Sequence, residues 1–289
     1  MIGKRGVTPA ARPCPACDGR EADPAFTVGG FEHVRCRECA TLFVAALPDA
    51  EAIAATYLAP DYHSSAQGQE ARMRAEADAR AAILRKYGVR EVLEVGCGPG
   101  HFLDACRDLG IRVEGVDRAA TAEAPRRRGH TVHDVWLADL APVEPRFDAV
   151  AMWEVLEHLP DPKDMLVRAR AWLRPGGFLA LSTPSSSGLP ARALGPRFPM
   201  VCPPDHLELF SRAGLAALLA RAGFDPVRWT SFSGLGRPEL RRALQRRVLG
   251  ASLPARALAA GLAVVGEPVA RAVDRAGYGS AFEVYAVAR

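Results

Sequence analysis

The sequence of 289 residues lacks any long apolar run. Residues 1–20 contain no apolar segment of the kind that a secretory signal carries. The longest late apolar stretch, residues 257–266, is too short to cross a hydrocarbon layer of about 30 Å. We therefore expect a protein without a membrane span that resides in the cytoplasm.

Lysine is scarce, and positive charge is carried almost entirely by arginine. Lysine occurs only at positions 4, 86 and 163, and the formal net charge is +4. Such a weak excess gives little support for a nucleic-acid partner. No internal repeat is visible, and no sequence signal fixes an oligomeric state. A small-molecule substrate is the partner that this composition favours.

The common phosphate-binding motifs are also missing. The stretch from Val92 to Gly100 reads VLEVGCGPG. A dinucleotide fingerprint would need a sixth-position glycine where His101 stands, and no Gly-Lys-Ser/Thr follows. The apolar run predicts a buried parallel strand, and the glycine cluster predicts a tight turn into a helix. The helix N-terminus would then face a polar ligand. What remains is an acid followed by three alternating glycines: Glu94, Gly96, Gly98 and Gly100.

This pattern resembles the first motif of the class I S-adenosylmethionine-dependent methyltransferases. An ordinary glycine-rich turn in another α/β protein is the alternative interpretation. A second strand, residues 112–116, ends at Asp117. An acid at the end of the second strand, about 20 residues after the glycine loop, can accept hydrogen bonds from ribose hydroxyls. The resemblance therefore implies S-adenosyl-L-methionine as cofactor, with the glycine loop admitting its methionine portion.

A second motif follows the strand predicted at residues 147–153. The run Glu154-Val-Leu-Glu157-His158 precedes Pro-Asp-Pro, and it resembles the branch that includes the ubiquinone-biosynthesis O-methyltransferases. The resemblance implies a Rossmann-like α/β fold, a seven-stranded, mostly parallel sheet with helices on both faces. It places Trp153 beside the methionine end of the cofactor. It also implies that Asp134 contacts adenine, with Asp139 as a competing candidate.

Four cysteines form two Cys-x-x-Cys pairs near the N-terminus. The spacer between the pairs, positions 18–35, has the length typical of a loop in a tetrahedral zinc site. Two disulfides, or a ribbon that has lost its metal, are the alternatives. A site closed by four thiolates leaves no open position for chemistry, so the Zn2+ would be structural. The predicted ligands are Cys14, Cys17, Cys36 and Cys39. The region resembles a zinc-binding N-terminal segment found on a subset of class I methyltransferases, which commonly continues into a paired-tyrosine segment, here Tyr57 and Tyr62.

A long connection, residues 184–210, carries little periodicity and is predicted to be a lid over the acceptor. Its Pro-Pro-x-His-Leu segment again resembles the same methyltransferase branch. His206 would deliver a base to a substrate hydroxyl, since imidazole titrates near neutral pH. His158 is the second candidate base. The alternative for Glu157 and His158 is that they fix the loop by hydrogen bonding.

The sequence thus predicts three regions: a zinc-ribbon-like module at 1–48, a helical linker and active-site cover at 49–87, and a methyltransferase domain at 88–289. The domain would carry the lid at 184–210 and a helical insertion at 237–275. The predicted activity is methyl transfer to a small molecule, at a hydroxyl oxygen. The alternatives are C- or N-methylation of a sugar or other metabolite, a nucleic-acid or protein methyltransferase that uses the ribbon for recognition, and a non-catalytic cofactor-binding protein.

Overall fold

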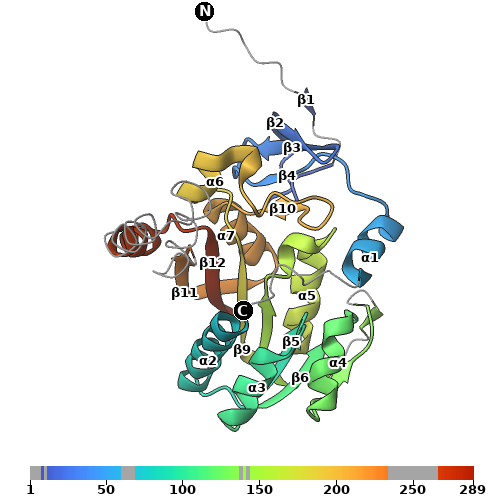
Figure 1. The fold of residues 1–289 in the computed structure, drawn as a ribbon, viewed down its shortest axis with the longest axis vertical. Coiled ribbons are helices and arrows are strands. Elements are labelled where there is room, and N and C mark those ends of the chain that lie inside the picture. The colour runs from blue at the N-terminus through green and yellow to red at the C-terminus, as the bar shows by residue number, and fades with distance from the viewer. Residues whose placement is uncertain (1–7, 10–11, 60–68, 137–138, 141–143, 234–265) are drawn as a thin grey trace, which may run out of the picture.

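The structure is a computed structural model, and it describes residues 8–9, 12–59, 69–136, 139–140, 144–233 and 266–289 (Figure 1). Its main sheet has seven strands in the order β11-β12-β9-β8-β5-β6-β7. All pairings are parallel except those of β12, which runs antiparallel to both neighbours. This is the predicted Rossmann-like sheet. Its strands are β5 (Glu91–Val95), β6 (Arg112–Val116), β7 (Val132–His133), β8 (Phe147–Trp153), β9 (Leu173–Pro184), β11 (Phe224–Phe232) and β12 (Ala281–Ala288).

Helices cover both faces of this sheet, because its strands are apolar on both sides. On β8, Ala149 and Ala151 pack toward α2 and α3, whereas Val150 and Met152 pack toward α5 and α7. Successive side chains of a strand point to opposite faces, so one strand feeds two cores. The helices are α2 (Glu70–Lys86), α3 (His101–Asp108), α4 (Glu123–Arg127), α5 (Pro162–Trp172) and α7 (Arg212–Arg221).

A second, antiparallel sheet holds the N-terminal region, in the order β1-β2-β3-β4-β10. The strands β1 (Thr8–Pro9), β2 (Glu21–Val28), β3 (Phe31–Cys36) and β4 (Leu42–Val44) come from the ribbon. The fifth, β10 (Glu208–Leu209), comes from the end of the predicted lid and pairs with Phe43 and Leu42. The ribbon therefore shares a sheet with the lid, a connection that the boundary at residue 48 does not anticipate.

The predicted lid contains ordered secondary structure rather than an irregular loop. It forms α6 (Leu189–Leu194) and a 3-10 helix at Gly195–Arg197, and Phe198 and Val201 bury their side chains against Leu42 and Leu209. The linker forms α1 (Ala50–Leu58), capped by the side chain of Asp49.

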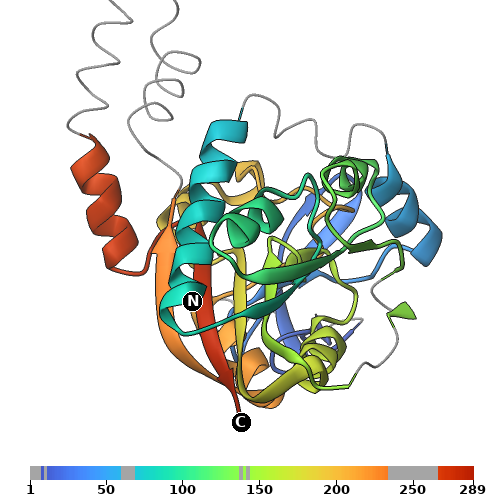
Figure 2. The same ribbon diagram turned by 90° about the horizontal axis from the view of Figure 1, so that it is seen from below.

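Much of the predicted insertion at 237–275, and Tyr62, lie outside the described residues. Its last part is a helix at residues 266–275. Figures 1 and 2 show this dark red helix and α1 on opposite sides of the molecule. None of the helices in the described ranges combines the length and apolarity that crossing a bilayer requires.

Candidate active site

The glycine loop follows β5 at the carboxyl edge of the sheet. Gly96, Gly98 and Gly100 adopt φ values of +72°, +46° and +77°. A Cβ at Gly96 would lie 2.8 Å from Cγ2 of Val155, and one at Gly100 would lie 2.5 Å from Cβ of Pro125. Both the backbone conformation and the lack of space therefore require glycine here.

Asp117 follows β6 and lies beside this loop. Its side chain is buried, and its Oδ2 accepts the amide N–H of Gly98 at 2.7 Å. Oδ1 accepts two further hydrogen bonds, from the amide of Ala119 at 2.7 Å and from the hydroxyl of Tyr57 at 2.5 Å. The carboxylate thus fixes the loop while offering Oδ1 to a hydroxyl group. In this structure the hydroxyl comes from Tyr57 of α1.

Glu94 lies at the end of β5, fully enclosed. Burial, together with the nearby charge of Asp117, raises the pKa of this carboxyl well above its usual range. Its Oε2 has no hydrogen-bond partner among the described residues. A buried polar atom of this kind normally has a partner, so a donor on a bound ligand fits here. The ammonium group of the cofactor's methionine portion is such a donor.

Trp153 ends β8, at the same edge of the sheet. The guanidinium of Arg80, from α2, lies 4.3 Å from the ring centroid. Arg80 is held by Glu283 at 3.0 Å and by the hydroxyl of Ser182 at 3.4 Å. Trp153 packs edge-on against Phe102 at the start of α3. The sequence did not single out Arg80, although this cation lies against the residue predicted to mark the methionine end.

The predicted adenine contact is more open. Asp134 is exposed and pairs with Arg118 at 3.3 Å. The Arg118 guanidinium lies 4.8 Å from the ring centroid of Trp136, which also contacts Tyr57 at a centroid distance of 5.9 Å. The competing residue Asp139 is exposed, and its backbone N–H donates a hydrogen bond to the carbonyl oxygen of Trp136. The rings of Tyr57 and Trp136 and the carboxyl group of Asp134 therefore lie near one another beside Asp117.

The Glu-x-x-Glu-His motif begins at a strained residue. Glu154 has φ +56°, unusual for a residue other than glycine, and its amide bonds the carbonyl of Ser182 at 3.0 Å. Glu157 is fully buried and accepts the Thr183 hydroxyl at 2.9 Å. Burial and the charge of Glu154 raise the pKa of Glu157 to about 8. The backbone carbonyl of Glu157 also accepts the amide of Leu207, which ties the motif to the lid.

The two candidate bases lie together, with ring centroids 4.7 Å apart. His206 Nδ1 lies 2.8 Å from the carbonyl oxygen of Met200, so Nδ1 carries the proton and Nε2 keeps the lone pair. Burial and the neighbouring charge of His158 lower the pKa of His206 to about 4. The ring is therefore neutral at physiological pH. Nε2 lies 3.9 Å from Oδ2 of Asp205.

His158 has the opposite electrostatic environment. Its Nδ1 lies 2.9 Å from the backbone carbonyl oxygen of Asp205 and 3.0 Å from Oδ1 of the same residue. Burial acts to lower the pKa of His158, but the hydrogen bond to Asp205 and the charges of Glu157 and Asp205 outweigh it and raise the pKa to about 9. At neutral pH one imidazole of the pair is thus charged and the other is neutral.

These side chains also form two groups of potential metal donors. Glu157, His158 and His206 present ligand atoms within 4.8 Å of one another, and so do Cys202, Asp205 and His206. Each imidazole already uses Nδ1 in a hydrogen bond to a backbone carbonyl. Because Nδ1 of His206 is engaged in this way, Nε2 is the nitrogen of that ring that suits proton transfer.

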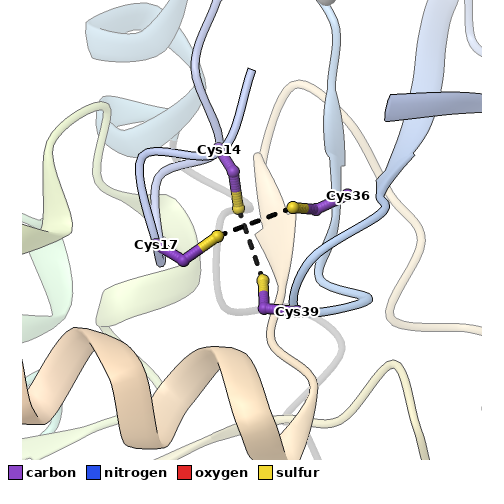
Figure 3. A group of neighbouring side chains, drawn as sticks. All are labelled: Cys14, Cys17, Cys36 and Cys39. Atoms are coloured by element: carbon purple, nitrogen blue, oxygen red, sulfur yellow. Dashed lines mark hydrogen bonds between the residues drawn. The ribbon is translucent and has the colours of Figure 1, made fainter. Parts of the chain in front are cut away.

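The four N-terminal cysteines converge, as Figure 3 shows. The Sγ atoms of Cys14 and Cys39 are 3.6 Å apart, and those of Cys17 and Cys36 are 3.5 Å apart. Four sulfurs about 2.3 Å from a tetrahedral Zn2+ would lie about 3.8 Å from one another, whereas a disulfide needs about 2.05 Å. The observed separations fit a zinc site and exclude the two disulfides in this structure. The contact between Cys14 and Cys39 lowers the pKa of Cys39 and raises that of Cys14, so without a metal ion the two sulfurs share a proton.

Comparison with known proteins agrees with this geometry. A family model described as a methyltransferase domain matches residues 51–228. This chain belongs to that methyltransferase family.

Among curated relatives, a ubiquinone biosynthesis O-methyltransferase of Xanthomonas campestris pv. campestris is 38% identical over 113 residues, 36% of this chain and 46% of that enzyme. The enzyme of the same name from Cereibacter sphaeroides is 32% identical over 163 residues, 51% of this chain and 64% of that enzyme. The matches thus span less than two thirds of either relative.

Solved structures show the same fold at low identity. The 1,6-didemethyltoxoflavin-N1-methyltransferase of Burkholderia thailandensis, solved with S-adenosylhomocysteine, aligns with a TM-score of 0.52 and 20% identity, covering 92% of this chain and 99% of that chain. A SAM-dependent methyltransferase of Archaeoglobus fulgidus aligns with a TM-score of 0.50 and 20% identity, covering 73% and 94%. The class I methyltransferase fold is therefore shown.

Proposed function

We propose that this protein transfers the methyl group of S-adenosyl-L-methionine to a hydroxyl oxygen of a small molecule. The observation that carries the proposal is the neutral, buried His206 beside the charged His158. The similarity to ubiquinone-biosynthesis O-methyltransferases supports oxygen as the acceptor atom.

The residues at the carboxyl edge fit the cofactor. The three glycines give the loop the positive φ values that hold it beside Asp117, and the unpaired Oε2 of Glu94 can accept a hydrogen bond from an ammonium group. Oδ1 of Asp117, which accepts the Tyr57 hydroxyl, can accept a ribose hydroxyl instead. Arg80 over Trp153 supplies a cation for a carboxylate. When bound, the sulfonium supplies an activated methyl group, so the protein need only align the acceptor and remove its proton.

His206 is the proposed base. Because Nδ1 is committed to the carbonyl of Met200, Nε2 can accept the acceptor's hydroxyl proton. The imidazolium that forms would be stabilised by Asp205, whose Oδ2 lies 3.9 Å away. His158, already protonated, would stabilise negative charge that develops on the acceptor oxygen. The two histidines would thus divide the work of proton removal and charge stabilisation.

Zn2+ in the Cys14, Cys17, Cys36 and Cys39 site would have a structural role. The Sγ–Sγ separations support that role, and all four positions of a tetrahedral ion would be filled by thiolates. Metal analysis of the purified protein should give about one zinc per chain.

The test is incubation of methyl-labelled S-adenosyl-L-methionine with fractionated small-molecule extracts. Wild type should label a product, and His206→Asn should lower that rate by about 100- to 10,000-fold. His133→Asn is the matched control, because this exposed histidine pairs with Glu114 far from the lid. Calorimetric binding of S-adenosylhomocysteine should be unchanged in both variants. Undiminished labelling by His206→Asn would remove that residue from the reaction.

Two further results would redirect the proposal. The carbon-13 shift of the transferred methyl group distinguishes oxygen from nitrogen and carbon acceptors. Binding of S-adenosylhomocysteine without any labelled product would instead favour a non-catalytic cofactor-binding protein.

A further inference from the structure

A cavity of about 870 Å³ lies at the edge of the main sheet, away from the candidate active site. Its walls come from β11, the start of α7, Ser187 at the beginning of the predicted lid, and the helix at residues 266–275 with the turn after it. The volume lies within the usual range for small-molecule sites. The residues that matter for its chemistry are Arg212, Trp229, Arg271, Asp274, Arg275 and Tyr278.

This cavity is separate from the predicted cofactor site. Across the sheet, Thr230 of β11 lies opposite Glu283 of β12. Glu283 lies opposite Ser182 of β9, and Ser182 lies opposite Trp153 of β8. Three strand spacings of about 4.8 Å put the two positions about 14 Å apart. Trp229 also packs against the core that faces α5 and α7, whereas Trp153 packs against the core that faces α2 and α3.

Positive charge dominates the cavity. Three arginines line it, against the single carboxylate of Asp274. Arg271 pairs with Glu267 at 2.6 Å, but in the described ranges neither Arg212 nor Arg275 pairs with a carboxylate. Burial raises the pKa of Asp274, which weakens its ability to neutralise the arginines. Two guanidinium groups are therefore left to bind an anion.

Arg212 is held in place before any ligand arrives. Its guanidinium lies 4.8 Å from the ring centroid of Trp229, whose other contact is edge-on to Phe282. Stacking on an aromatic face limits the conformations of a long side chain and leaves its N–H groups directed outward. Gly277, in the turn after the helix at residues 266–275, leaves space for the guanidinium of Arg212, because a Cβ there would lie 3.3 Å from its Nη1.

We propose that this arginine cavity binds a phosphate group. Guanidinium groups donate pairs of parallel hydrogen bonds that match phosphate oxygens, and two or three of them here surround one space. The phosphate could be offered by a soluble phosphorylated molecule or by a phospholipid headgroup. The size of the cavity suits a phosphate with an organic substituent.

The experiment uses the full chain and two probes. Inorganic pyrophosphate is titrated calorimetrically at low salt, and binding to phosphatidylglycerol vesicles is compared with binding to phosphatidylcholine vesicles. Arg275→Gln and Arg212→Gln should each weaken binding of the effective probe at least tenfold. Arg168→Gln is the control, because it removes the same charge from α5, outside the cavity. Circular dichroism checks that each variant is folded.

Pyrophosphate binding that the cavity variants lose would assign the site to a soluble phosphate. Binding only to phosphatidylglycerol, lost in the same variants, would assign it to a headgroup. Absence of binding to either probe, or equal binding by wild type and both cavity variants, would overturn the proposal. Neither result bears on methyl transfer, which the His206 variant tests separately.

Discussion

The hydroxyl of Tyr57 donates a 2.5 Å hydrogen bond to Oδ1 of Asp117, so α1 reaches across to the end of β6. Tyr57 precedes the first strand of the main sheet in the chain, and α2 lies between them. Its side chain nevertheless contacts Asp117, the acid proposed to hold the ribose. The ring of the same tyrosine contacts that of Trp136, near the predicted adenine contact Asp134. The linker is therefore part of the proposed cofactor site.

Tyr57→Phe should tighten the binding of S-adenosylhomocysteine. In the absence of cofactor, the tyrosine hydroxyl occupies an acceptor that a ribose hydroxyl would use. Removing a hydrogen bond worth about 1 kcal/mol should lower Kd by about fivefold, measured by calorimetry. Tyr87→Phe, at the C-cap of α2 where the ring stacks on Phe178, should leave Kd unchanged. Weaker binding by Tyr57→Phe would mean that the hydroxyl helps to hold the cofactor.

Loss of metal from the ribbon should loosen the lid. The carbonyl of Cys39 accepts the hydroxyl of Ser211, the N-cap of α7, and β4 pairs with β10. Chelation, or Cys39→Ser, should therefore speed hydrogen exchange at residues 42–44 and 207–215 by at least tenfold. Exchange in β5 and β8 should not change, because those strands pack in the main sheet. Cys106→Ser, a buried cysteine of α3, is the control. Equal exchange with and without metal would show that the lid does not depend on the site.

The pH profile should reflect which histidine is the base. His206 has a pKa near 4, so it stays neutral, and competent as a base, as the pH falls from 8 to 5. His158 has a pKa near 9 and loses its charge only above that pH. The rate of methyl transfer should therefore be flat between about pH 5 and 8 and fall above 9. His158→Gln should abolish the alkaline fall. A wild-type rate that drops tenfold per unit below pH 6.5 would instead indicate an ordinary imidazole base.

Glu157→Gln should alter how stability depends on pH. The carboxyl of the unfolded chain titrates near its ordinary pKa of 4.5, whereas burial and Glu154 raise the pKa in the folded protein to about 8. Between these values the folded state binds more protons, so the free energy of unfolding falls as the pH rises. Urea unfolding should show this slope in wild type and a smaller slope in the variant. Glu123→Gln, at an exposed position on α4, should keep the wild-type slope.

Much of the fold follows from local patterns. The strands at residues 112–116 and 147–153 match the predicted bounds, and the second of them is largely an apolar run. Asp161 and Ser211 cap α5 and α7, each by accepting a backbone N–H of the first turn with its side chain. The four cysteines converge because their spacing allows little else.

The remaining features depend on long-range packing that no local signal carries. Arg80 is one of several arginines on and near α2, and only the docking of that helix onto the sheet brings it to Trp153. Similarly, β10 is two residues long and lies in a connection without periodicity, so its partner strand cannot be deduced from its sequence. The roles proposed for His158 and His206 depend on pKa differences that arise only when the lid is folded.

The pairing of β4 with β10 has a consequence for protein engineering. In a chimera whose positions 1–48 came from a relative, β4 would be replaced by a strand that evolved to pair with a different lid. The exchange would also remove Arg12, whose guanidinium lies 3.0 Å from the buried carboxylate of Glu208. Positions 1–48 would therefore have to be exchanged together with β10, although β5 to β9 separate the two segments in the chain.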